Sequence, residues 1–144
     1  MSLQQTATTS FKVQLAQGVH NFGPTAPDTF KIALYIGSAT LDATTAVYTT
    51  TGETSGTGYT AGGEVLMITV TPTSVPNSTV AYLSFADAAW SPAVFTARGA
   101  LIYNSTKGNK SVAVLDFGAD KTAATTFTVV FPAADQSSAI LRIS

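Results

Sequence analysis

The stretch Phe30-Lys31-Ile32-Ala33-Leu34-Tyr35-Ile36 decides the fold class. Large apolar side chains occupy every second position in it, which is the period of a β-strand. Further short runs rich in β-branched and aromatic residues follow at 65–71, 79–85, 95–103, 111–117, 126–131 and 139–143, with a weaker run at 46–50. Clusters of Gly, Pro, Asn and Ser separate these runs and provide turn residues. The sequence therefore predicts an all-β protein.

Seven or eight short strands separated by turns are typical of a single β-sandwich. The clearest turn lies between residues 103 and 111, where Asn104, Gly108 and Asn109 favour a hairpin. The spacing does not separate a jelly-roll from an immunoglobulin-like topology, so both remain open. The Thr- and Gly-rich segment 38–63 is longer than an ordinary loop, which indicates that it is functional or ordered by contacts elsewhere.

One short N-terminal helix is expected before the strands. Phe11, Leu15 and Val19 recur at the spacing of one helix face, and Thr9 or Ser10 would cap its start. Everything after this helix is predicted to consist of strands and loops.

Residues 1–8 contain little apolar surface apart from Leu3, which is too little to fold alone. We expect them to form an arm that is mobile in the isolated protein and becomes ordered on a partner. The chain then divides into an N-terminal arm with the short helix, residues 1–27, and a β-sandwich domain, residues 28–144.

Charged residues are scarce in this chain. Only 10% of its 144 residues are charged, and the net charge is −1, whereas charged residues make up about 25% of an average protein. This balance excludes the basic surface of a nucleic-acid binder or of a protein that binds anionic membranes. There are 24 Thr and 13 Ser instead, and a surface solvated by hydroxyls resists association poorly. Two interpretations remain: a Thr-rich β protein with an ordinary, weakly charged surface, or a subunit whose surface is suited to assembly with other proteins, and we favour the second.

Targeting and membrane signals are absent from the sequence. The first residues, Met1 to Gln5, lack the basic and apolar regions of a signal peptide, and no apolar run approaches the roughly 20 residues that cross a bilayer. The chain has no Cys, which excludes disulfides and thiolate zinc sites. We expect synthesis in a cytoplasm and no membrane partner.

No group of residues marks an active site. His20 is the single histidine, no Ser lies in a G-x-S-x-G motif, and a histidine near a helix end is accounted for by the helix dipole. The segment 56–61, Gly-Thr-Gly-Tyr-Thr-Ala, fits the loose form G-x-G-x-x-[GA], but no strand precedes it and no helix follows it, as dinucleotide binding requires. We therefore expect no enzyme, no catalytic residue, no cofactor and no metal.

Segments spread over nearly the whole chain carry a family resemblance. They are Asp28-Thr29-Phe30-Lys31-Ile32-Ala33-Leu34-Tyr35, Ser38-Ala39-Thr40-Leu41-Asp42, Tyr48-Thr49-Thr50-Thr51-Gly52-Glu53, the Gly-rich stretch 56–63, Ala100-Leu101-Ile102-Tyr103-Asn104, Leu115-Asp116-Phe117-Gly118 and Leu141-Arg142-Ile143. In these segments the chain resembles a family of small structural (virion) proteins of tailed bacteriophages. The helix with Phe11 and His20 is similar to the N-terminal segment of that family.

The resemblance implies a non-enzymatic virion structural protein. The function that it most directly implies is that of a capsid decoration (cement) protein, which stabilises the phage head from the capsid surface through protein–protein contacts. Such a protein would be made in the host cytoplasm. Its partners would be the major capsid protein and copies of itself in a homotrimer. The position in the particle, head or tail, stays open.

The alternative function is a tail- or fibre-associated module that binds host surface glycan; a hydrolase is a third. An exposed aromatic platform would favour glycan binding, and Tyr48, Tyr59 and Trp90 are its candidates, although core or interface packing explains the same three residues. Candidate partner contacts are therefore Leu3, Phe11, Tyr48, Tyr59 and Trp90.

Overall fold

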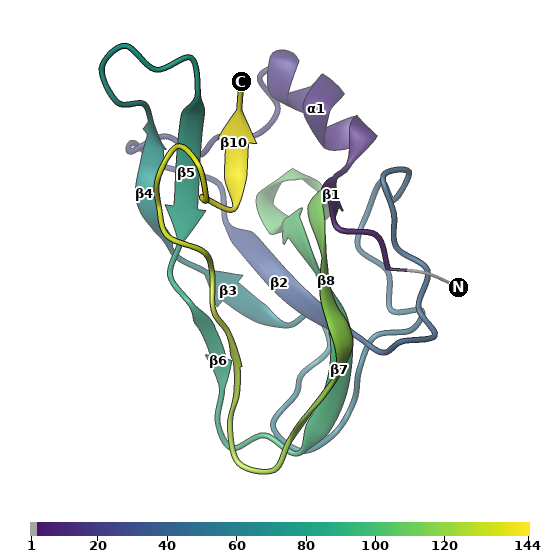
Figure 1. The fold of residues 1–144 in the computed structure, drawn as a ribbon. Helices are drawn as coiled ribbons and strands as arrows, with labels where there is room; N and C mark the ends of the chain where they lie inside the picture. The colour runs from purple at the N-terminus through teal and green to yellow at the C-terminus, as the bar shows by residue number, and fades with distance from the viewer. Residues whose placement is uncertain (1–2) are drawn as a thin grey trace.

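In a computed structural model that describes residues 3–144, the chain forms three antiparallel sheets and one α-helix (Figure 1). The largest sheet has the strand order β1 (Thr6–Ala7), β8 (Lys110–Ala123), β7 (Phe95–Asn104), β2 (Phe30–Tyr35) and β3 (Glu64–Leu66). The second has the order β10 (Leu141–Ile143), β5 (Ala81–Phe85) and β4 (Ile68–Thr73), and the third pairs β6 (Ala88–Trp90) with β9 (Phe127–Val129). The prediction of a β protein with one short N-terminal helix is confirmed.

The stretch that decides the fold class forms β2, between β3 and β7. Phe30, Ile32 and Leu34 lie in the main core, whereas Ala33 and Tyr35 belong to a second core on the opposite face of the sheet. The alternation of the sequence thus separates two cores, because this strand is buried on both faces.

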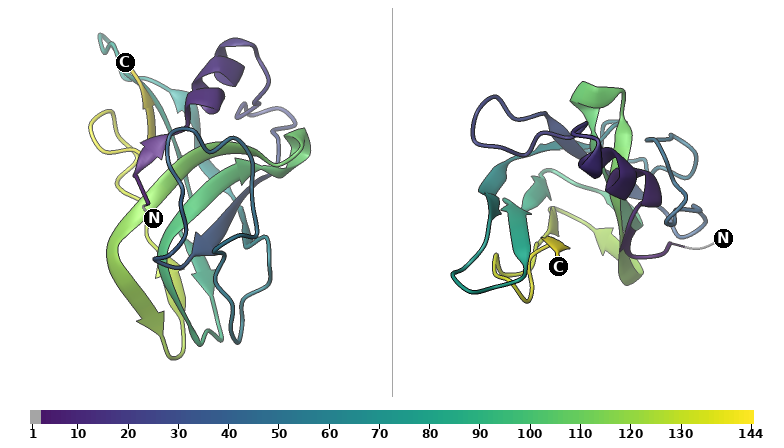
Figure 2. Two further views of the ribbon diagram at one scale, coloured as in Figure 1. Left: turned by 90° about the vertical axis from the view of Figure 1, so that its right-hand side faces the viewer. Right: turned by 90° about the horizontal axis from the view of Figure 1, so that it is seen from above.

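The main core lies between the large sheet and the two smaller ones. Phe30 and Ile102 of the large sheet share it with Leu83 and Phe85 of β5. The view from above in Figure 2 shows β4, β5 and β10 facing the large sheet, with the helix α1 (Thr9–Ala16) across the end nearest the viewer. The second core is smaller and lies on the outer face of the large sheet.

The segment 38–63 covers this outer face. Figure 2 (left) shows it crossing in front of the large sheet, and Ala39, Leu41 and Tyr48 pack there against sheet residues such as Tyr103. The expected strand at 46–50 is not formed; Val47 makes only an isolated bridge to β8. The long segment is therefore ordered by contacts with the sheet and not by strand pairing of its own.

The described part of the expected N-terminal arm, residues 3–8, is ordered against the protein's own sheet. Thr6 pairs with Val114 of β8, and Thr8 is fully buried and caps α1 by accepting from the Phe11 backbone N–H at 3.3 Å. The expectations of a mobile arm and of a cap at Thr9 or Ser10 are wrong here, because the segment has a strand edge beside it. Met1 and Ser2 lie outside the described residues.

Residues on both sides of position 27 contribute to the main core. Phe11 of α1 and Phe22 of the following loop lie in the same core cluster as β2 and β5. Helix α1 ends at Ala16, so Val19 is not part of the helix stripe.

Most expected strands are present with shifted ends. The run at 65–71 is divided at Met67 into β3 and β4, and Pro72 lies inside β4, where an edge strand tolerates its missing N–H. Strand β8 continues past Gly118 to Ala123. The expected hairpin between residues 103 and 111 is confirmed, with Asn104 as the cap of a single 3-10 turn. Strands β1 and β6 were not anticipated from the sequence.

Candidate functional site

An open apolar groove of about 780 Å³ lies between α1, β5 and β10. Its apolar walls include Phe11, Leu15, Phe22, Leu83, Leu141 and Ile143. A smaller hollow of about 360 Å³ between β1, β8 and β10 adjoins it and shares Ala7, Leu141, Arg142 and Ser144 with it. The two hollows follow the gap between β1, at one edge of the large sheet, and β10, at one edge of the three-stranded sheet.

The groove exists because three elements approach one another without closing. Helix α1 buries Phe11 in the core, but Leu15, one turn later, is only half-buried. Strand β10 buries Leu141 at 8% exposure and leaves Ile143 at 55%. Apolar side chains therefore continue from the interior onto an accessible surface.

The two charged side chains that line the groove are both positive. Lys12 of α1 and Arg142 of β10 are its charged lining residues, and neither forms a salt bridge within the part of the chain that the structure describes. The Arg142 Nη1 donates a hydrogen bond to the Ser137 carbonyl oxygen at 2.6 Å. No carboxylate side chain is among the described lining residues.

The predicted contact residues do not form one site: Tyr59 and Trp90 stack at the main core, Leu3 and Tyr48 lie at the second core, and Phe11 lines the groove. Phe11 and Trp90 are 5% and 2% exposed, so the protein's own core takes up most of both side chains, and Phe11 keeps a small accessible part on the inner wall of the groove. Leu3 bridges to Leu41 at the second core. Tyr48 and Tyr59 are half-buried, Tyr48 at the second core and Tyr59 at the main core.

Tyr48, Tyr59 and Trp90, the candidates for an aromatic platform under the glycan-binding alternative, therefore do not lie together on one exposed surface. Tyr59 stacks on Trp90 with ring centroids 6.2 Å apart at the main core, whereas Tyr48 stacks on Tyr103 at 4.8 Å on the other side of the sheet. Sequence reasoning missed the groove residues Lys12, Leu83 and Arg142, because a groove between strands distant in sequence leaves no local pattern.

Glu53 organises the segment 38–63 through its carboxylate. Its Oε1 accepts hydrogen bonds from the Tyr59 hydroxyl at 2.6 Å and from the Gly62 N–H at 2.8 Å, and its Oε2 accepts one from the Tyr48 hydroxyl at 2.7 Å. Burial, followed by the bond to Glu53, raises the pKa of both tyrosines above the ordinary value. Both hydroxyls therefore stay protonated and act as donors.

Three tyrosine hydroxyls also fasten this segment to the sheet. The Tyr59 hydroxyl accepts from the Leu34 N–H at 2.9 Å, where β2 extends beyond β3. Tyr35 donates to the Thr49 carbonyl and Tyr103 donates to the Gly62 carbonyl, each at 2.6 Å. Burial raises the pKa of Tyr103 to about 12.

The G-x-G-x-x-[GA] match at 56–61 is part of this fastened segment. A Cβ on Gly58 would overlap the Pro92 carbonyl, and its φ is +86°, so the position requires glycine for close packing. The motif serves loop geometry, and no helix follows it.

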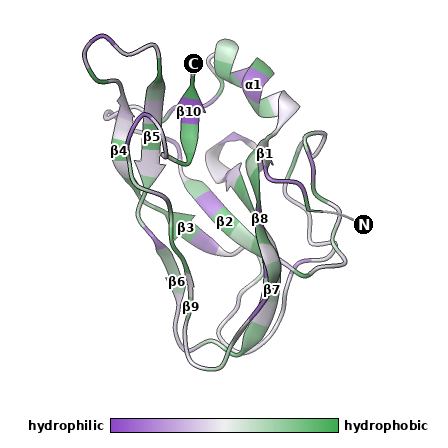
Figure 3. Cartoon of the chain, viewed as in Figure 1, coloured by the Kyte–Doolittle hydropathy of each residue, from purple (hydrophilic) through white to green (hydrophobic). Residues whose placement is uncertain are grey.

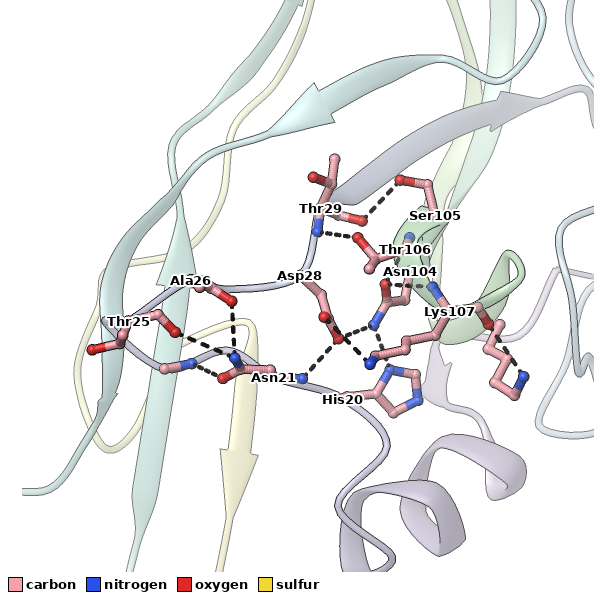
Figure 4. Close-up of polar contacts among 12 residues, drawn as sticks. His20, Asn21, Thr25, Ala26, Asp28, Thr29, Asn104, Ser105, Thr106 and Lys107 are labelled. Atoms are coloured by element: carbon pink, nitrogen blue, oxygen red, sulfur yellow. Dashed lines mark hydrogen bonds and ion pairs between the residues drawn. The ribbon is translucent and has the colours of Figure 1, made fainter.

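A second polar cluster surrounds His20 near the hairpin turn (Figure 4). The Asn104 Oδ1 accepts from the N–H groups of Thr106 and Lys107 at 3.1 and 3.2 Å, which fixes the orientation of its amide. Its Nδ2 then donates to the Asp28 Oδ2 at 2.8 Å and to the His20 Nδ1 at 3.0 Å.

This arrangement assigns the protonation state of His20. Because Nδ1 accepts from Asn104, the proton of the neutral ring lies on Nε2, which donates to the Gln14 Oε1 at 2.9 Å. Burial lowers the pKa of His20 and outweighs the opposite effect of Asp28, and Lys110 and Lys107 lower it further. The cluster joins the segment after α1 to the hairpin, and its groups are engaged with one another.

We expect the free energy of unfolding to decrease as the pH is lowered through about 6.5, the ordinary pKa of histidine. The folded-state pKa of His20 is depressed, so the unfolded chain binds the proton more readily and acid favours unfolding. Urea unfolding at pH 7 and pH 5 measures the effect. His20→Gln offers a similar acceptor without titrating and should show the smaller loss; equal losses in both proteins would contradict the assignment.

Within residues 3–144, no helix combines the length and the apolar character needed to cross a membrane. Over the same residues, no group of three or more His, Asp or Glu side chains is placed to hold a metal ion. No protein-family model, curated protein or solved structure matches the chain.

Proposed function

We propose that this chain is a non-enzymatic virion structural protein that acts as a capsid decoration (cement) protein. The observation that carries the proposal is the apolar groove beside α1, β5 and β10, which leaves Leu15 and Ile143 accessible next to buried core residues. Contiguous accessible apolar surface is the usual mark of a protein–protein contact. The resemblance to phage structural proteins is the reason for proposing that the partner belongs to a phage particle.

The two described polar clusters support a structural role. The Glu53 carboxylate and the His20–Asn104–Asp28 group are both engaged in holding loops against the sheet. We class the fold as a β-sandwich, since the three-stranded sheet and the large sheet face each other across one core. The jelly-roll and immunoglobulin-like topologies both stay within this proposal.

The proposed partners are the major capsid protein and further copies of this chain, in a homotrimer at the capsid surface. The glycan-binding alternative loses its support, because the aromatic residues on which it depends lie at two separate cores. Imaging particles assembled without the chain tests the proposal: density should be missing from the outside of the head. Density missing only from the tail would contradict it.

Binding to the particle is expected to weaken only slightly between low and moderate salt concentration. Only 10% of the residues are charged, and exposed ion pairs contribute about 0–1 kcal/mol each. The loss of binding is measured as the occupancy on purified particles after washing at about 50 mM and at about 500 mM NaCl. These concentrations lie on two sides of the range in which surface charges become screened. Complete release by salt alone would show that ion pairs dominate the contact.

A further inference from the structure

We propose that the groove between α1, β5 and β10 binds an extended segment of a partner protein, which pairs with the free edge of β10 and carries apolar side chains and a carboxylate. This inference rests on the proposed function as a protein-binding component and names the chemistry of the partner. Its support comes from the shape of the groove, the open edge of β10 and the positions of the charged side chains.

The size and lining of the groove suit side chains of a bound peptide. Its volume of about 780 Å³ lies within the roughly 300–1,000 Å³ that is typical of ligand sites. Leu15 and Ile143 are accessible on its walls, and Phe11, Leu83 and Leu141 close its inner side. Apolar side chains inserted here would continue the main core.

The edge of β10 offers backbone groups to the same segment. Strand β10 pairs with β5 along one edge, at Leu141 with Leu83 and at Ile143 with Ala81, and no other described strand pairs with it. An open strand edge is a template for an added strand, and main-chain hydrogen bonds then supply affinity while alternate side chains supply specificity. Strand addition at β10 would place the new segment in the gap towards β1.

The alternation of apolar and charged side chains along β10 determines which side chains a paired partner strand should carry. Leu141 and Ile143 share one face of the strand and Arg142 lies on the other. Figure 3 shows the corresponding hydrophilic band between two hydrophobic ones on β10. A residue opposite Arg142 on an added strand lies beside its guanidinium, where opposite charge stabilises the pair. Lys12 adds a second positive charge at the groove, and no described lining side chain is acidic.

The same charge argues against a second copy of this chain as the occupant. A two-fold antiparallel pair of β10 strands that uses all three residues would place Arg142 opposite the Arg142 of the other copy. Like charges directly opposite each other destabilise a strand pair. A different chain with a carboxylate at this position fits better.

The test uses two blocked seven-residue peptides and the full chain. In both peptides valine occupies positions one, three, five and seven, and threonine positions two and six; the centre is glutamate in one and lysine in the other. Titration of the labelled protein, followed by amide NMR shifts, should show changes confined to β10, α1, β5 and the facing strand β1. The lysine peptide should bind about fivefold more weakly, the ratio that a cross-strand pair of about 1 kcal/mol gives.

A charge exchange provides the sharpest variant. Arg142→Glu should reverse the preference, so that the lysine peptide binds more tightly than the glutamate peptide. Because Arg142 also donates to Ser137, Lys12→Glu serves as a second variant without that contact and should reduce the preference. Lys121→Glu makes the same charge change on an exposed part of β8 and should leave both affinities unchanged.

Four outcomes would overturn the inference: no shift at the groove with either peptide, shifts located elsewhere, equal binding of both peptides, or a dimer in solution that Arg142→Glu affects. Particle occupancy separates this inference from the proposed function. Full occupancy by Arg142→Glu and Lys12→Glu would refute the groove as the contact and leave the decoration role standing. Peptide binding at the groove without any binding of the unmodified chain to particles would refute the decoration role instead.

Discussion

Trp90→Ala is expected to lower the free energy of unfolding by about 3–5 kcal/mol, the usual cost of removing a buried Trp or Phe side chain. Trp90 is 2% exposed and packs against Tyr59, Phe95 and Phe127 with ring centroids 6.1–6.4 Å apart. For a protein of this size such a loss lowers the melting temperature by about 6–20 °C. Chemical and thermal unfolding measure it directly.

Trp90→Phe is the matched control for this prediction. The Trp90 indole N–H is buried without a hydrogen-bond partner among the described residues, and an unsatisfied buried donor costs about 1–3 kcal/mol. Phenylalanine removes the donor while keeping an aromatic ring, so the loss of volume and the relief of the donor should nearly cancel. A Trp90→Phe protein as unstable as Trp90→Ala, or a Trp90→Ala protein as stable as the unmodified chain, would contradict this account.

Glu53→Ala is expected to lower the free energy of unfolding by about 3 kcal/mol. The substitution removes three hydrogen bonds to a carboxylate, each worth about 1.5–3 kcal/mol when buried, and the half-buried position lets water recover part of that energy. The segment 38–63 should loosen first, because Tyr48, Tyr59 and Gly62 all depend on this side chain. Hydrogen exchange of the Leu34 and Gly62 amides should accelerate more than that of β7.

Glu53→Gln tests how much of this stabilisation comes from the charge of the carboxylate and how much from its hydrogen-bond geometry. Its amide oxygen at the Oε1 position still accepts from Tyr59 and Gly62, and the Tyr48 hydroxyl rotates to accept from the amide nitrogen. The loss should therefore be about 1 kcal/mol, the value of a typical hydrogen bond. If Glu53→Ala unfolded no more easily than Glu53→Gln, the carboxylate would not be what holds the segment.

The strands were predictable because their signal is local. The period of two at Phe30 to Tyr35 corresponds to β2, and the turn residues Asn104, Gly108 and Asn109 correspond to the hairpin of β7 and β8. Strand β1 could not be predicted because Thr6 and Ala7 are too few residues to show a periodicity. They form a strand because they pair with Val114 and Ala113. The attachment of segment 38–63 to the sheet could not be predicted either. It depends on hydrogen bonds from the side chains of Tyr35 and Tyr103, which lie outside the segment.

The candidate site was less predictable than the fold. Tyr48, Tyr59 and Trp90 were open to two interpretations, an exposed platform or packing in a core. Tyr59 and Trp90 contribute to a core that forms only when distant strands meet. The groove depends on β10 and α1 lying beside each other, although they stand at opposite ends of the chain. Strand order in space decides both features, and no short pattern of residues encodes that order.

The pairing of β1 with β8 sets a limit on how this protein can fold during synthesis. Thr6 meets Val114, so β1 has no partner until the residues up to Val114 have been made. At about 5–20 residues per second, this wait lasts roughly 5–20 s on the ribosome. During that time the N-terminal segment and the apolar face of α1 are uncovered, which exposes them to chaperones and to neighbouring nascent chains. The edge of the large sheet is therefore completed late, when β8 has been made and β1 can pair with it.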